Sequence, residues 1–112
     1  MLGAQPYGRQ ASRAEELLQA ALTKAVVEGK GAEAIPLFEE ALRTPGVTAR
    51  VTAKALLHLG GIYTSLCRPE ARDTYERLVR EFSGQPESGE ASKKLAALPA
   101  CIGRMVQRTL WT

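Results

Sequence analysis

The sequence predicts an all-α domain, and three observations support this prediction. The chain of 112 residues is rich in Ala, Leu, Glu, Lys and Arg, which favour helices, and only 5% of its residues are aromatic. Apolar residues recur at spacings of three and four, as they do on the buried face of a helix. The stretch 55–82 reads as two amphipathic helices joined by a turn, with a fainter copy at 17–42. Such repetition is typical of stacked helical hairpins.

The first predicted helix begins at Arg13, because Ser12 and Glu15 form a capping box that satisfies free backbone amides. It is expected to end near Glu28, since Gly29 tolerates a positive φ. Its apolar face comprises Leu17, Leu18, Ala21, Leu22, Ala25 and Val26. Residues 1–11 are expected to form a flexible N-terminus, and the helical domain is expected to span 12–98.

The second and third helices are predicted at about 32–43 and 48–66. Pro36 lies close to the start of the second helix, where a missing amide costs less, so we expect it to bend the first turn. Gly60 and Gly61 interrupt the third helix, and each costs about 1 kcal/mol relative to Ala. We therefore expect the backbone of a neighbouring helix to approach closely there. The stripe predicted to be buried on the third helix is Val51, Ala55, Leu56, Leu59, Ile62, Tyr63 and Leu66.

The fourth helix is predicted to start at Pro69, whose fixed φ suits a first helical position, and to end near Phe82. A short fifth helix follows at about 87–98 and is closed by Pro99. The tail, 99–112, alternates apolar and polar residues between 105 and 112 with a period nearer two than 3.6. It is expected to be irregular or a single strand, and it is a candidate for the start of a truncated following domain.

The two hairpins match each other and carry a family resemblance. Aligning the second helices pairs Ala34 with Ala71 and Phe38 with Tyr75, and aligning the first helices pairs Leu18 with Leu56. The chain resembles the tetratricopeptide-repeat family between about 14 and 98. The matching residues are Gly29, Ala34, Phe38 and Ala41 in the first unit and Leu59, Gly60, Tyr63, Ala71 and Tyr75 in the second. Three residues differ from the pattern of that family, namely Ala25, Leu78 and Ser83.

The resemblance implies two helix-turn-helix hairpins plus a capping helix, a fragment of a right-handed α-solenoid. More narrowly, Leu-Gly-Gly-Ile-Tyr at 59–63 and the run at 75–82 are similar to repeats of bacterial envelope proteins associated with the Tol-Pal system. They also resemble helical segments that precede Tol-type β-propellers. In that case residues 105–112 would correspond to the start of a first propeller strand.

The same resemblance implies where a ligand would bind. In a solenoid of hairpins the first helices line a concave face, which is expected to receive an extended or helical peptide. The residues mapped to that face are Glu16, Gln19, Thr23, Val27, Lys54, Leu57, Gly61 and Thr64. For each of them, packing against the fifth helix is the alternative. The Lys and Asn pattern that clamps a peptide C-terminus in some family members is absent.

The sequence contains no group of residues with the types and spacing that catalysis requires, so no enzyme activity, catalytic residue, metal site or cofactor is predicted. The only histidine, His58, has no paired-histidine spacing. Cys67 and Cys101 follow the ends of the third and fifth helices and should lie at one edge of the stack. A disulfide between them requires an oxidising compartment and Cα atoms within about 7 Å. Free thiols are favoured, with the disulfide as the alternative.

The chain is predicted to act as a protein-interaction or scaffold module. Its partner is predicted to be a protein or peptide, which the sequence does not identify. The alternative is an oligomerisation or spacer segment of a larger bacterial envelope protein, for which a homodimer is one form. The net charge is +3, with Lys and Arg interleaved among Glu and Asp, so no nucleic-acid partner is predicted. No apolar run reaches 18 residues, so no membrane insertion is predicted. As it stands the chain would be cytoplasmic, or periplasmic if an upstream signal peptide is missing.

Overall fold

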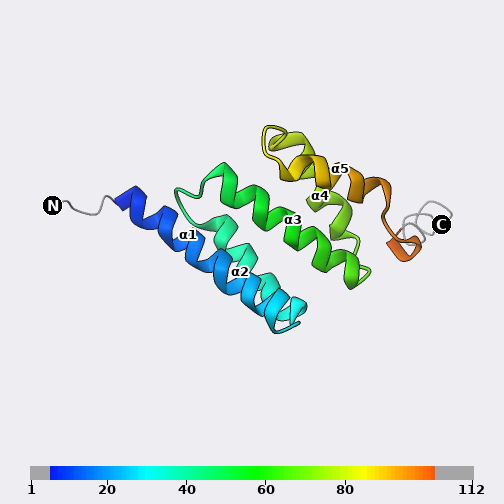
Figure 1. The fold of residues 1–112 in the computed structure, drawn as a ribbon, viewed down its shortest axis with the longest axis horizontal. Coiled ribbons are helices and arrows are strands. Elements are labelled where there is room, and N and C mark those ends of the chain that lie inside the picture. Colours follow the sequence, from blue (N-terminus) through cyan, green and yellow to red (C-terminus); the bar gives the residue numbers. More distant parts are fainter. Residues whose placement is uncertain (1–5, 103–112) are drawn as a thin grey trace. The chain divides into compact units, whose positions relative to one another are not determined.

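The computed structural model describes the backbone of residues 6–102 and the side chains of residues 13–102, and every regular element in this range is a helix (Figure 1). This confirms the all-α prediction for the described residues. The elements are α1 (Pro6–Leu22), the π-helix η1 (Thr23–Val27), α2 (Gly31–Arg43), α3 (Ala49–Ser65), α4 (Glu70–Glu81) and α5 (Glu87–Ala96). The chain divides into two compact units, and the boundary follows Ala55 within α3.

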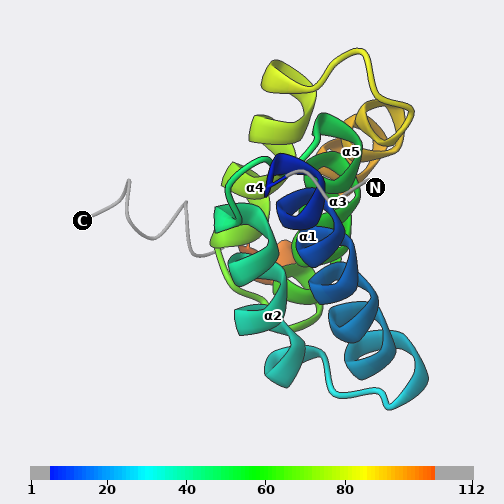
Figure 2. The same ribbon diagram turned by 90° about the vertical axis from the view of Figure 1, so that its left-hand side faces the viewer.

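In the first unit, α1 and its continuation η1 pack against α2 as a helical hairpin (Figure 2). Small residues and a few large ones form its core, namely Ala14, Leu18, Ala21, Ala34, Ile35, Phe38, Ala41, Val51 and Ala53. The predicted start of the first helix at Arg13 was wrong, because α1 begins at Pro6. Proline suits the first turn of a helix, where its missing amide would have no helical partner.

The end of η1 agrees with the predicted end near Glu28. The amide of Glu28 donates a hydrogen bond to the carbonyl of Thr23 at 3.0 Å, the wide spacing of a π-helix. Gly29 follows with a φ of 69°, the left-handed conformation that the sequence predicted a glycine would supply. α2 then runs through Pro36 to Arg43.

α3 has a capped start: the hydroxyl of Thr48 accepts a hydrogen bond from the amide of Val51 at 3.2 Å. Its buried residues include Val51, Ala55, Leu56, Leu59 and Tyr63, all from the predicted stripe. Leu66 was wrongly placed in that stripe, because it follows the end of α3 and is 44% exposed. Leu66 lies in the turn after Ser65, so its side chain no longer follows the helical spacing that would place it on the buried face of α3.

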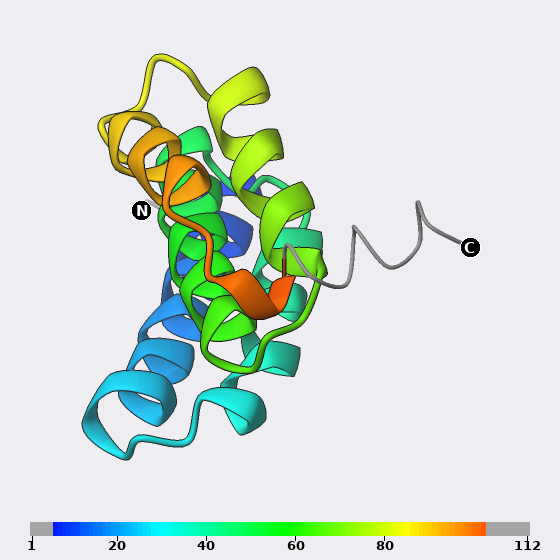
Figure 3. The same cartoon turned by 90° about the vertical axis from the view of Figure 1, so that its right-hand side faces the viewer.

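In the second unit, α4 and α5 pack side by side (Figure 3). Ala71, Tyr75 and Leu78 of α4 and Ala91 of α5 are buried. The close approach predicted at Gly60 exists, but it is made by a ring. A Cβ built on Gly60 would lie 2.6 Å from Cζ of Tyr75, so the prediction of an approaching backbone was wrong. The missing side chain of Gly60 makes room for an aromatic side chain of α4.

The chain after α5 continues into a short helical turn that includes residues 100–102, where Ile102 is fully buried. The strand predicted within 105–112 lies outside the described residues, as do residues 1–5 of the predicted flexible N-terminus.

Candidate functional site

An open groove of about 490 Å³ lies in the first unit, between α1 and the first turns of α3. This volume is within the range typical of ligand-binding clefts. We call it the α1–α3 groove; its lining residues are Glu15, Glu16, Leu18, Gln19, Arg50, Val51 and Lys54.

The helical period decides which of these residues form the floor and which form the walls. Leu18 and Val51 belong to the buried faces of their helices and are only 5% and 4% exposed, so they form an apolar floor. Glu15, Glu16 and Gln19 stand on the adjoining exposed face of α1. On the α3 side Arg50 and Lys54 are four residues apart, one helical turn, and thus share a face.

The groove brings together three of the residues predicted from the repeat, Glu16, Gln19 and Lys54. The prediction missed Glu15 and Arg50. A signal was present for each, because Glu15 adjoins Glu16 and Arg50 lies one turn before Lys54. Thr23 and Val27 lie in η1 and do not line the groove; both are exposed, Val27 by 78%.

The remaining predicted residues, Leu57, Gly61 and Thr64, are half-buried in the part of α3 that belongs to the second unit. The hydroxyl of Thr64 donates a hydrogen bond to the carbonyl of Gly60 at 2.7 Å. A Cβ on Gly61 would lie 3.8 Å from the hydroxyl oxygen of Tyr75. Gly61 therefore lies beside the phenol of Tyr75, and Thr64 forms a hydrogen bond with that phenol.

The environment of Tyr75 favours its neutral form. Burial raises the pKa of Tyr75, a hydrogen bond with Thr64 acts in the opposite direction, and the negative charge of Glu90 raises the pKa further. Because the phenol is buried between α3 and α4 and is hydrogen-bonded, we interpret it as a structural group of the second unit.

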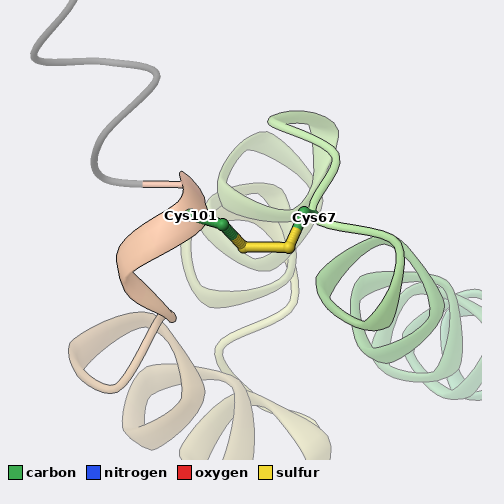
Figure 4. Close-up of a disulfide and its surroundings, with 2 residues drawn as sticks. All are labelled: Cys67 and Cys101. Carbon is green, nitrogen blue, oxygen red and sulfur yellow. A yellow bond between two sulfur atoms is a disulfide. The ribbon is translucent and has the colours of Figure 1, made fainter.

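Cys67 and Cys101 form a disulfide in the second unit (Figure 4). Their Cα atoms are 5.8 Å apart, within the distance that a bridge requires. The bond links the turn after α3 to the helical turn after α5, next to the buried Ile102. The structure therefore contains the bridged form, and not the free thiols that the sequence favoured. The sequence placed both cysteines at one edge of the stack, but it did not give the distance between their Cα atoms.

The turn that carries Cys67 is also held by an ion pair. The guanidinium of Arg68 donates to both carboxylate oxygens of Glu70, at 2.6 and 3.3 Å, and stacks 5.1 Å from the centre of the Tyr63 ring. The hydrogen bond from Arg68 lowers the pKa of Glu70. These contacts organise the connection between α3 and α4.

Comparisons of the chain with protein-family models, with curated proteins and with solved structures found no match. Across the described part of the chain, no three His, Cys, Asp or Glu side chains gather as a metal site would require. None of the described helices combines the length and apolar character needed to cross a bilayer.

Proposed function

We propose that this chain is a protein-interaction module that binds a peptide segment in the α1–α3 groove. The observation that carries the proposal is the convergence of Glu16, Gln19 and Lys54 on one groove. The repeat pattern assigns these residues to the first helices of two successive hairpins. Their presence in a single groove supports a ligand-binding use of this surface.

The proposal includes the tetratricopeptide-type architecture, with two hairpins and a capping helix in a right-handed solenoid of the kind found in bacterial envelope proteins. Two features support it. The hairpin of α1, η1 and α2 covers the first repeat, and the contact of Gly60 with Tyr75 lies between the two helices of the second. In such arrays the first helix of each hairpin lines the ligand-binding face.

The groove is suited to binding and not to bond-breaking chemistry. Its polar groups are charged side chains and one amide, placed around a narrow apolar floor. Such a lining can orient a peptide by ion pairs and by hydrogen bonds to its backbone. The proposed function is accordingly non-enzymatic.

Peptide binding to the full chain tests the proposal. A library of fluorescent peptides is screened by anisotropy, and the peptides that bind are measured again with a Glu16→Ala/Lys54→Ala variant. We expect the dissociation constant to rise about tenfold or more, because two wall contacts are lost. The matched control is Asp73→Ala/Lys93→Ala, which removes one exposed acid and one exposed base outside the groove lining and should leave affinity unchanged. Equal affinities of the two variants would contradict the proposal.

The second candidate function is an oligomerisation or spacer segment without a groove ligand. It is favoured by one observation: Val26 and Val27 are neighbours in η1 and are 67% and 78% exposed, so the prediction of Val26 on the apolar face of the first helix was wrong. Light scattering separates the candidates. A stable dimer that becomes monomeric in Val26→Ser/Val27→Ser, together with a chain that captures no peptide, would favour the second candidate. A monomer that binds peptides favours the first.

A further inference from the structure

The two walls of the α1–α3 groove carry opposite charges. Glu15 and Glu16 stand on the α1 wall, and Arg50 and Lys54 stand on the α3 wall. Within the described part of the chain, none of these four side chains takes part in an ion pair. Other charged residues of the same unit do, as in the contacts of Arg13 with Glu40 at 3.2 Å and of Lys24 with Glu28 at 3.3 Å. These four charged side chains are therefore available to pair with charged groups of a ligand.

Each wall also places like charges side by side. Arg50 and Lys54 are one turn apart on α3, and Glu15 and Glu16 are adjacent on α1. Like charges one turn apart on a helix repel each other, as Arg50 and Lys54 do, whereas the adjacent Glu15 and Glu16 point in different directions and only share the negative side of the groove. A ligand group of opposite sign would remove this repulsion and gain an ion pair at the same time. Each wall thus favours a ligand group of the opposite charge.

The space between the walls favours a short apolar group. The floor consists of Leu18 and Val51, of which only small patches are exposed. A small branched apolar side chain matches these small apolar patches better than a large aromatic one would. The amide of Gln19 can both donate a hydrogen bond to a peptide backbone and accept one from it.

We infer that the α1–α3 groove recognises a peptide segment in which a basic side chain and an acidic side chain flank a short apolar one. The basic side chain lies against Glu15 and Glu16, and the acidic one lies against Arg50 and Lys54. This inference rests on the proposed peptide-binding function and specifies the ligand. A polyacidic segment or a nucleic-acid backbone is repelled by the α1 wall, and a polybasic segment is repelled by the α3 wall.

The test uses acetylated, amidated peptides of equal length in an Ala/Ser background. Two carry Lys–Val–Glu and Glu–Val–Lys, to allow for either chain direction. Three controls carry Glu–Val–Glu, Lys–Val–Lys and Gln–Val–Gln. We expect one of the mixed-charge peptides to bind the full chain about tenfold more tightly than every control. Each exposed ion pair adds a modest amount of binding free energy, and only a mixed-charge peptide can form both pairs. The difference should shrink as salt is raised.

Two wall variants supply an independent readout. Glu15→Gln/Glu16→Gln should shift the preference toward the Glu–Val–Glu peptide, and Arg50→Gln/Lys54→Gln should shift it toward Lys–Val–Lys. Both variants change exposed or half-exposed groups, and circular dichroism checks that they fold. If the neutral control binds the wild-type chain as well as the mixed-charge peptides do, the inference is wrong while peptide binding stands. If no peptide binds, including those of the wider library, the proposed function itself fails.

Discussion

At the residue scale, Gly60 and Gly61 show how two identical neighbours in one helix acquire different roles. The ring of Tyr75 occupies the space beside Gly60, where a Cβ would lie 2.6 Å from Cζ. The space beside Gly61 is wider, because a Cβ at that position would lie 3.8 Å from the nearest side-chain atom, the Tyr75 hydroxyl oxygen. Only Gly60 is therefore required by packing, because tightly packed interiors tolerate an added methyl group poorly.

Substitution by alanine should affect stability differently at the two positions. We expect Gly60→Ala to lower the free energy of unfolding by about 1–3 kcal/mol, because the ring must move. Gly61→Ala should leave it unchanged or raise it by up to about 1 kcal/mol, since alanine favours the helix. Urea unfolding followed by circular dichroism measures both, and Gly61→Ala serves as the matched control. Equal losses in the two variants would argue against this packing.

At the element scale, the end of the first hairpin helix depends on backbone geometry. η1 widens the last turn to a π-helix, and Gly29 then adopts a φ of 69°. The amide of Lys30 donates a hydrogen bond back to the carbonyl of Lys24 at 2.8 Å, which satisfies a carbonyl at the helix end. This geometry reverses the chain and brings α2 against α1.

Gly29→Ala is expected to lower the free energy of unfolding by about 1–2 kcal/mol, because an L-residue is strained in the left-handed conformation. Gly89→Ala is the matched control. Gly89 lies in α5, and a Cβ there would meet nothing within 4 Å. Gly89→Ala should raise the free energy of unfolding by about 0.5–1 kcal/mol, because alanine has a higher helix propensity than glycine. Thermal or urea unfolding compares the two, and a stabilising Gly29→Ala would contradict the assigned cap.

At the scale of the whole molecule, the disulfide connects parts of the second unit that are distant in sequence. Cys67 and Cys101 are 34 residues apart, and the closed loop contains both α4 and α5. Such a link limits the conformations of the unfolded chain and stabilises the folded one. It also holds the helical turn that buries Ile102.

Removal of the disulfide should lower the free energy of unfolding by about 2–4 kcal/mol. The comparison uses Cys67→Ser/Cys101→Ser and the wild-type chain, each with and without a thiol reductant. The reductant should shift the urea midpoint of the wild type and leave that of the double variant unchanged. Two alkylatable thiols in the unreduced wild-type chain, or a wild-type midpoint insensitive to reductant, would contradict the assigned bond.

The sequence by itself determined the helices and most of their buried faces. Spacings of three and four residues located α2, α3, α4 and α5 to within a few residues, and Gly29 marked the end of the first helix. These helix predictions succeeded because helix periodicity and the stop at Gly29 depend on residues within a turn or two of one another. For the groove, the sequence supplied Glu16, Gln19 and Lys54 through the repeat resemblance, and their use by a ligand stays a prediction.

Only the tertiary structure decided which distant residues meet. It placed the Tyr75 ring on Gly60, joined Cys67 to Cys101, and added Glu15 and Arg50 to the groove. Each of these outcomes depends on the distance between side chains of different helices, which changes with the rotation of a helix and the path of a turn. Local sequence patterns specify the face that a helix buries, whereas packing selects the residue that each side chain contacts.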